Sequence, residues 1–147
     1  IKSWQYGISG ILCLFHDELI PIGVFSLLGK FYGVQVTIPV IAALLTVFGY
    51  AINNVIVVFD RLREIILKEK KIALEEAINR SLNQTLTRQI NTSLTTLFGV
   101  LAIFFLGGET LKYFALALIL GITAGTYSSL FLATPILFSW VSRNKGD

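Results

Sequence analysis

Long apolar runs alternate along the chain with short polar segments. Four apolar runs cover about residues 4–29, 36–59, 82–106 and 111–141, and a transmembrane helix takes about 20 residues. Within lipid only helices and closed barrels satisfy their own backbone, and no run shows the apolar–polar alternation of a barrel strand. The pattern therefore predicts an all-α membrane protein with four transmembrane helices.

The composition agrees with lipid as the main solvent. Hydrophobic residues make up 54% of the 147 residues, charged residues 14%, and the mean hydropathy is +0.74. Soluble domains carry about 25% charged residues, and a chain this apolar is not disordered. Because the sequence starts at Ile1 and contains no methionine, we expect 1–147 to be one transmembrane domain that forms a fragment of a longer protein.

Basic residues are distributed unequally between the two sides of the predicted membrane domain. Nine lie on the side of the termini and the 60–80 connection: Lys2, Arg61, Arg63, Lys68, Lys70, Lys71, Arg80, Arg143 and Lys145. Only Lys30 and Lys112 lie on the other side. Since Lys and Arg mark cytoplasmic loops, both termini and the 60–80 connection are predicted to be cytoplasmic.

The segment 60–80 is charged and amphipathic. Leu62, Ile66, Ala73 and Ala77 recur at near-helical spacing with charged residues between them. This pattern predicts a helix that lies on the membrane surface. Two alternatives stay open, a solvated connector and a docking surface for a cytoplasmic partner.

Three consecutive polar residues, His16, Asp17 and Glu18, interrupt the first apolar run. Successive helical residues point about 100° apart, so these side chains cannot share one face. Polar groups at membrane depth are costly, which makes them candidates for function, and at least one must reach a neighbouring helix or water. Alternatively, the span is broken here, or its first half lies at the interface.

Two further polar clusters have similar predicted depths. Asn53 and Asn54 come near the end of the second run, and Arg88 belongs to a polar stripe at the start of the third. At 1.5 Å per residue, Asn54 lies roughly 10 Å and Arg88 about 9 Å below the cytoplasmic edge. We expect the two to face each other, with Asn, a carboxylate or the Tyr50 hydroxyl as acceptors for Arg88. The alternative is that Arg88 extends to the interface along its own stem.

The fourth run carries small residues at every fourth position. They are Ala117, Gly121, Gly125, Ser129 and Ala133. Such a stripe lets the backbone of another helix approach closely. We therefore predict that this face packs against a neighbouring helix.

Several collinear motifs make the chain similar to the SecF family of protein-export membrane proteins. Residues 43–64 read ALLTVFGYAINNVIVVFDRLRE, which resembles the SecF signature. The SLNQTLTR of 81–88, the NTSLTT of 91–96, the GGE of 107–109, the GITAGTYSS of 121–129 and the pair His16-Asp17 extend the resemblance. It covers nearly the whole chain.

This resemblance implies a function in protein export. SecF belongs with SecD to a complex of the resistance–nodulation–division superfamily, which assists the SecY/SecE/SecG channel and is driven by the proton-motive force. The family usually has six spans and a periplasmic domain, so these four would be the last four. The implied partners are a SecD-like subunit, that channel, preprotein substrates and membrane lipids, in the bacterial inner (plasma) membrane.

One position departs from the family pattern. Where the family usually has Asp, in a proton relay with the Arg that Arg88 matches, this chain has Asn54. An Asn amide forms hydrogen bonds but does not titrate. Proton coupling would then pass through SecD, would use Asp17 or Glu18, or would be lost.

Other functions stay open, namely half of a small-molecule or lipid exporter of the same superfamily, or a membrane scaffold without transport. The sequence contains no phosphate-binding glycine loop and no hydrolase constellation. The single His16 and single Cys13 have no metal-ligand spacing. We therefore expect no enzyme activity, cofactor, metal or nucleic-acid partner.

Overall fold

The computed structural model describes residues 3–143, and Lys2 and Lys145, which enter the charge asymmetry, lie outside this range. The helices are α1 Ser3–Tyr32, α2 Ile38–Lys68, α3 Leu74–Leu106, α4 Gly108–Phe131 and α5 Ala133–Arg143. The described part of the chain is helical and contains no strand. The predicted all-α class is confirmed.

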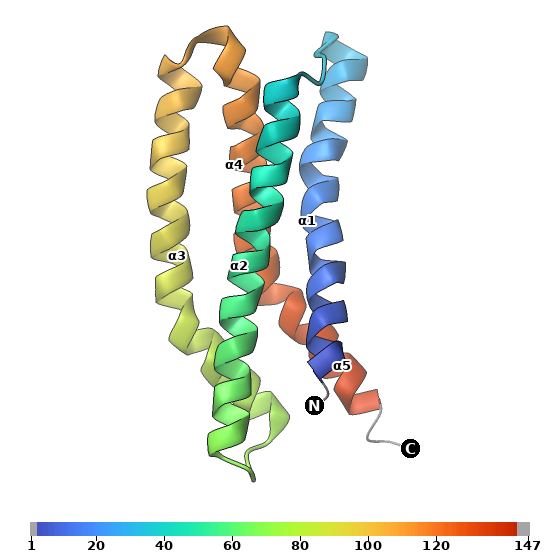
Figure 1. Cartoon of the computed structure of the whole chain (residues 1–147), viewed down its shortest axis with the longest axis vertical. Coiled ribbons are helices and arrows are strands. Elements are labelled where there is room, and N and C mark those ends of the chain that lie inside the picture. The colour runs from blue at the N-terminus through green and yellow to red at the C-terminus, as the bar shows by residue number, and fades with distance from the viewer. Residues whose placement is uncertain (1–2, 144–147) are drawn as a thin grey trace.

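Four stretches are long and apolar enough to cross a membrane. They are Trp4–Tyr32, Ile38–Lys68, Leu74–Leu106 and Gly108–Arg143. The helices run side by side, with both chain ends and the α2–α3 loop at one end of the bundle (Figure 1). The turns after α1 and α3 lie at the other end, so the charge-rich segments gather at one end. The chain is a multi-pass membrane protein.

The prediction of a separate surface helix over 60–80 is wrong. α2 continues past the apolar run to Lys68, and α3 already starts at Leu74. Leu62 and Ile65 of α2 share a buried apolar cluster with Ala77 of α3. Part of the helical periodicity of this segment therefore serves contacts between α2 and α3.

The fourth apolar run forms two helices, although we expected one. α4 ends at Phe131 and α5 begins at Ala133, with Leu132 between them at φ −110°. Pro135 has no N–H for the carbonyl of Phe131, and a proline is tolerated only in the first turn of a helix. α5 therefore takes a new direction and packs against α1.

α4 lies at the centre of the bundle and contacts every other helix. All five small residues of its predicted stripe (Ala117, Gly121, Gly125, Ser129 and Ala133) are buried. A Cβ atom on Gly121 would lie 2.3 Å from the side chain of Val47 on α2. α2 and α4 approach so closely because glycine adds no side chain at this point.

Candidate functional site

A layer of buried polar side chains crosses the bundle between two apolar clusters. The layer consists of Asp17, Asn54, Gln89, Ser93, Ser128 and Ser129, which come from four helices. One apolar cluster contains Val55 and Cys13, and the other contains Val47 and Ile122. Burial of polar groups among apolar ones costs free energy unless the groups bond to each other. We call this set the polar layer.

Gln89 links three helices within the polar layer. Its Nε2 donates to the backbone carbonyl of Asn54 on α2 at 3.2 Å. Its Oε1 accepts a hydrogen bond from the Ser129 hydroxyl on α4 at 2.9 Å. Only 3% of Gln89 is exposed. Both ends of the amide therefore have a protein partner.

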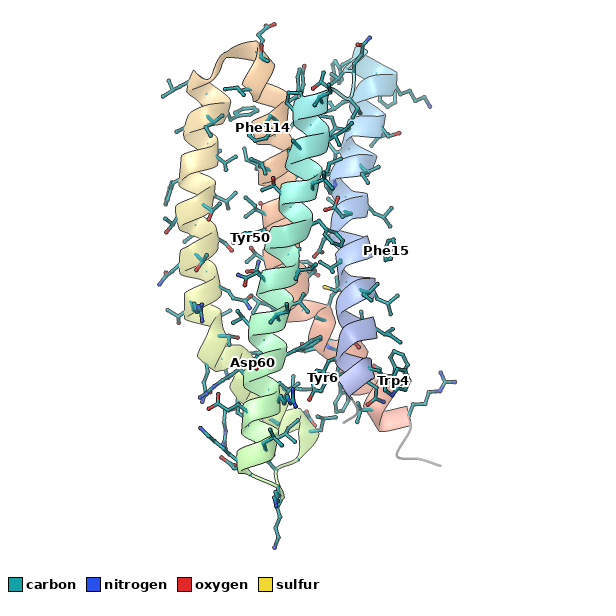
Figure 2. The ribbon with its side chains drawn as sticks, viewed as in Figure 1. Trp4, Tyr6, Phe15, Tyr50, Asp60 and Phe114 are labelled. Atoms are coloured by element: carbon teal, nitrogen blue, oxygen red, sulfur yellow. The ribbon has the colours of Figure 1, made fainter. Side chains whose placement is uncertain are left out.

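A chain of hydroxyl groups includes Ser93 of the polar layer, one helical turn after Gln89 on α3. Tyr50 projects from α2 towards α3 (Figure 2), with its hydroxyl 2.8 Å from Ser93 Oγ. Ser93 Oγ lies 2.6 Å from Thr126 Oγ1, which donates to the carbonyl of Ile122 at 2.8 Å. Each hydroxyl has one proton. The donors therefore run from Tyr50 to Ser93 and on to Thr126.

Asp17 is the buried carboxyl group of the polar layer, with 0% exposed. Its Oδ1 lies 3.3 Å from His16 Nδ1, whereas its Oδ2 has no hydrogen-bond partner within residues 3–143. A Cβ atom on Gly125 would lie 3.8 Å from Oδ2, and Ser128 lies beside Asp17. The carboxyl therefore faces α4.

Pro21 leaves a backbone carbonyl without its helical hydrogen bond at the level of Asp17. This proline lies inside α1, and its missing N–H leaves the carbonyl of residue 17 without its helical donor. α1 nevertheless runs without interruption from Ser3 to Tyr32. The alternative in which the first span breaks at the polar triplet is therefore wrong.

The other two members of the triplet flank the polar layer. His16 and Glu18 are both partly exposed, whereas Asp17 between them is fully buried. Glu18 Oε1 is buried and, in the described part of the chain, without a hydrogen-bond partner. The three side chains thus point in different directions, as their spacing along a helix requires.

Arg88 lies outside the polar layer, so its predicted contact with Asn54 is wrong. Arg88 is exposed, and its side chain makes no hydrogen bond or ion pair to residues 3–143. Its neighbour Gln89 occupies the position opposite Asn54. The predicted depth does not fix the rotation of α3, and one residue turns the side chain by about 100°.

Asn54 is buried, with 4% exposed, but the hydrogen-bonding capacity of its side-chain amide is not fully used. Its Nδ2 has no acceptor among the described residues. The adjacent Asn53 is exposed. The two asparagines therefore have different surroundings, and Asn54 alone belongs to the polar layer.

A second set of polar residues is exposed along α2 and α3, and we call it the outer polar stripe. It consists of Thr46, Asn53, Gln84, Arg88, Asn91 and Thr95. Thr46 and Thr95 donate to backbone carbonyls four residues earlier, which satisfies their hydroxyls. Arg61 Nε donates to Gln84 Oε1 at 2.6 Å and joins α2 to α3 at one end of the stripe. Polar groups are thus directed outwards from an otherwise apolar bundle.

Four inward-facing residues of α3 were not among the predicted site residues. Ser81, Thr85, Gln89 and Ser93 recur at every fourth position, and all four are buried. This spacing places them on one face of a helix. The four-residue spacing was visible in the sequence, but the neighbouring stripe with Arg88 contains the charged residue and was therefore predicted to face inwards.

These features define a class: an all-α, multi-pass membrane domain with hydrogen-bonded polar groups buried inside the helix bundle. Residues 2–143 match the family model for "Protein export membrane protein SecD/SecF, C-terminal". The chain belongs to this SecD/SecF C-terminal family.

Curated relatives and solved structures agree with this assignment. The protein translocase subunit SecF of Thermobaculum terrenum is 46% identical over 96% of this chain and 44% of its own length. The subunit SecDF of Thermus thermophilus is 47% identical over 99% of this chain and 19% of its own. A crystal structure of SecDF from Thermus thermophilus matches 95% of this chain and 19% of its own, with a TM-score of 0.89 at 46% identity. The chain thus spans less than half the length of these relatives.

Proposed function

We propose that the chain is the C-terminal transmembrane part of a SecF-type accessory subunit of the Sec preprotein translocase. In this function it assists protein export with a SecD-like subunit and the proton-motive force, beside the SecY/SecE/SecG channel. The family match over residues 2–143 supports the proposal. The charge asymmetry supports a bacterial inner membrane orientation with the α2–α3 loop and both ends of this chain in the cytoplasm.

The outer polar stripe is the structural observation that carries this proposal. Arg88 is exposed on a helix that crosses the membrane. An Arg at the centre of a span costs about 2.5–3.5 kcal/mol on insertion scales, and an Arg at the shallower depth expected for Arg88 costs less. A transmembrane partner with polar or acidic groups at the same depth offsets this cost. Relatives named SecDF join the two subunit names in one protein, which makes a SecD-like half the natural partner.

Within this proposal the proton-carrying group belongs to the SecD-like partner. Asn54 is an amide and cannot titrate, and Arg88 faces away from it. A partner carboxyl opposite Arg88 pairs with it when ionised and releases it when protonated. Asn53 and Asn54 then contribute hydrogen bonds, and Asp17, Glu18 and His16 lie apart from this exchange.

Cysteine cross-linking in the full-length protein tests the proposed partner face. We expect Asn91→Cys, in the outer polar stripe, to form cross-links to a co-expressed SecD-like subunit. Phe15→Cys is the matched control, because Phe15 is exposed on α1, across the bundle from α3 (Figure 2). Copurification with the SecY channel is the second readout. A protein that assembles with neither subunit, or cross-links equally from both positions, contradicts the proposal.

At position 54 the chain has an amide, which cannot titrate, and its Nδ2 has no acceptor among the described residues. This favours a second candidate, a membrane scaffold without transport. A scaffold needs the outer polar stripe for assembly but does not need a proton gradient. Export into membrane vesicles, measured with and without the gradient in the assembled complex, separates the two. Stimulation that does not depend on the gradient supports the scaffold, and substrate efflux without SecY would favour a small-molecule or lipid exporter.

A further inference from the structure

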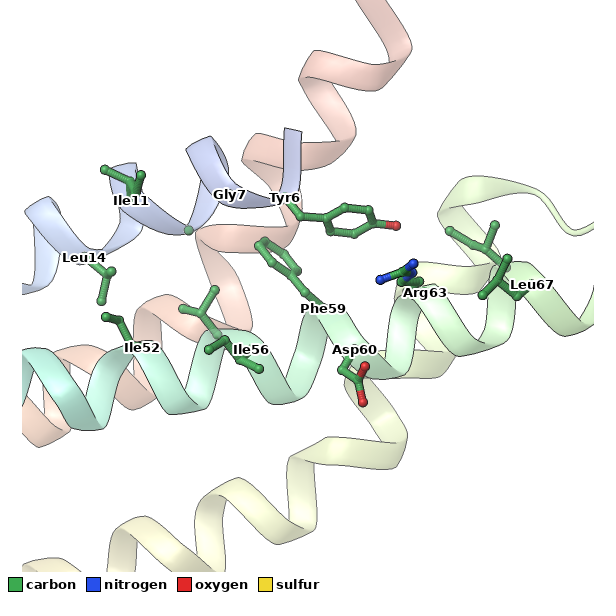
Figure 3. Close-up of a pocket in the computed structure, with 13 residues that line it drawn as sticks. Tyr6, Gly7, Ile11, Leu14, Ile52, Ile56, Phe59, Asp60, Arg63 and Leu67 are labelled. Atoms are coloured by element: carbon green, nitrogen blue, oxygen red, sulfur yellow. The ribbon is translucent and has the colours of Figure 1, made fainter. Parts of the chain in front are cut away.

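A groove of about 630 Å³ lies between α1 and α2, at the end of the bundle that holds both chain ends. Its walls are mainly apolar and include Ile11 and Leu14 of α1 and Ile52 and Ile56 of α2 (Figure 3). More than half of Ile11 and of Ile56 is exposed. The groove therefore opens to the outside of the bundle.

Two glycines, Gly7 and Gly10, leave part of the α1 wall of this groove without side chains. A Cβ atom on Gly7 would meet no other atom within 4 Å. A Cβ atom on Gly10 would lie 3.4 Å from Val55 and 3.9 Å from Phe59, which are ordinary contacts. The space beside Gly7 is thus free for a molecule other than this chain.

An exposed cation, Arg63, lines one end of the groove. The side chain of Arg63 makes no hydrogen bond or ion pair with residues 3–143, whereas Arg61 and Arg80 both pair with glutamates. In Figure 3 Arg63 points towards the Tyr6 hydroxyl, and Asp60, which also lines the groove, points away.

Tyr6 is held in place beside Arg63. Its ring packs edge-on against Phe59, with the ring centroids 5.4 Å apart. Arg63 lies four residues beyond Phe59, the last residue of the apolar run, which is about 6 Å along the helix. The apolar walls of the groove thus end at the Arg63 guanidinium and the Tyr6 hydroxyl, just beyond the end of the apolar run.

We propose that this groove binds an anionic phospholipid, with an acyl chain along the apolar walls and the phosphate at Arg63 and Tyr6. A guanidinium binds phosphate through two parallel hydrogen bonds, and a phenol hydroxyl adds a third donor. An apolar helix from the rest of the longer protein would fill the walls but leave Arg63 without an anion. The unpaired charge therefore favours the lipid. The inference does not depend on the export function.

Photo-cross-linking tests the proposal in the full-length protein. The probe is phosphatidylglycerol with a diazirine on its acyl chain, in phosphatidylcholine vesicles, and the control probe is diazirine-labelled phosphatidylcholine. We expect phosphatidylglycerol to label the segments 6–14 and 52–67 about tenfold more than phosphatidylcholine. Both lipids carry a phosphate, but the choline cation cancels the charge of that phosphate and repels Arg63, and a tenfold ratio corresponds to about 1.4 kcal/mol. Equal labelling by both lipids, or labelling confined to other segments, overturns the proposal.

Two matched pairs of variants locate the contact. Arg63→Gln should abolish the preference for phosphatidylglycerol, whereas Lys70→Gln, an equal change of charge in the exposed loop, should keep it. Gly7→Leu should fill the groove and reduce labelling by both lipids, whereas Gly23→Leu, also free of contacts on α1, should not. Thermal unfolding of each variant monitors folding. A folded Arg63→Gln variant that keeps its preference refutes the site, and inorganic phosphate that competes as well as the lipid refutes a lipid ligand.

Discussion

Gly121 of α4 and Val47 of α2 are in such close contact that no side chain fits between them. A Cβ atom on Gly121 would lie 2.3 Å from both Cγ atoms of Val47. Val47 is itself fully buried in the apolar cluster that joins α2 to α4. Because both residues lie within helices, relief would require the two backbones to move apart.

We therefore expect Gly121→Ala to destabilise the bundle by about 1–3 kcal/mol, the usual cost of overpacking. Thermal unfolding in detergent measures the effect. Gly49→Ala on α2 is the control, because a Cβ atom there meets nothing within 4 Å, and it should raise stability slightly through better helix propensity. A Gly121→Ala variant as stable as Gly49→Ala would contradict this close contact.

Gln89→Leu should destabilise the bundle by about 1 kcal/mol, a typical value for hydrogen bonds between membrane helices. The change removes the bonds to Asn54 and Ser129. The loss is limited, because the Ser129 hydroxyl has a second acceptor at 3.0 Å, the carbonyl of Thr126. Gln84→Leu, which alters an exposed contact of α3, should have a smaller effect on the unfolding temperature.

The number and type of helices could be predicted from the sequence, but two helix boundaries could not. The four spans follow from the length of apolar runs. The charges after Phe59 suggested the end of α2, but a helix can continue in water, where Glu64 bonds to both Arg61 and Lys68. Pro135 was visible in the sequence, yet a break at Leu132 depends on how α5 packs against α1.

The sequence predicted that the end of the second run and the start of the third meet at one level, and the hydrogen bond from Gln89 to the Asn54 carbonyl agrees with this. It did not predict which side chains of α3 point towards Asn54, because the rise per residue sets the position along a helix but not the rotation of the helix. The rotation of α3 depends on its contacts with α2 and α4, which turn Gln89 inwards and Arg88 outwards. Asp17 could be named as a candidate, but its burial against α4 needed the structure.

Arg88→Ala should impair export strongly while leaving the unfolding temperature of the isolated subunit almost unchanged. Arg88 is exposed and without an ion pair in the described chain, so little of this subunit's stability depends on it. Arg88→Lys keeps the charge and should keep part of the activity. Asn54→Ala should impair export less. Equal, wild-type export by Arg88→Ala and Asn54→Ala would favour the scaffold function.

Asp17→Asn should leave the gradient dependence of export unchanged and keep or raise thermal stability. The substitution preserves the shape of a fully buried side chain and removes a carboxyl with an unpaired Oδ2. The measurement is export at several values of pH, with Glu18→Gln as the control at the flank of the polar layer. A flattened pH profile in Asp17→Asn alone would instead assign proton transfer to Asp17.

Asn54→Asp should make export more dependent on the proton gradient. The change replaces a buried amide, whose Nδ2 has no acceptor within residues 3–143, by a carboxyl of nearly the same shape that can exchange a proton. Because burial disfavours its ionised form, the new group should alternate between charge states only as α2 and its neighbours move. Asn53→Asp is the matched control, since this position is exposed. Export assays in vesicles with imposed gradients compare the two variants, and an Asn54→Asp variant that responds like wild type would mean that this half of the complex no longer transmits protonation.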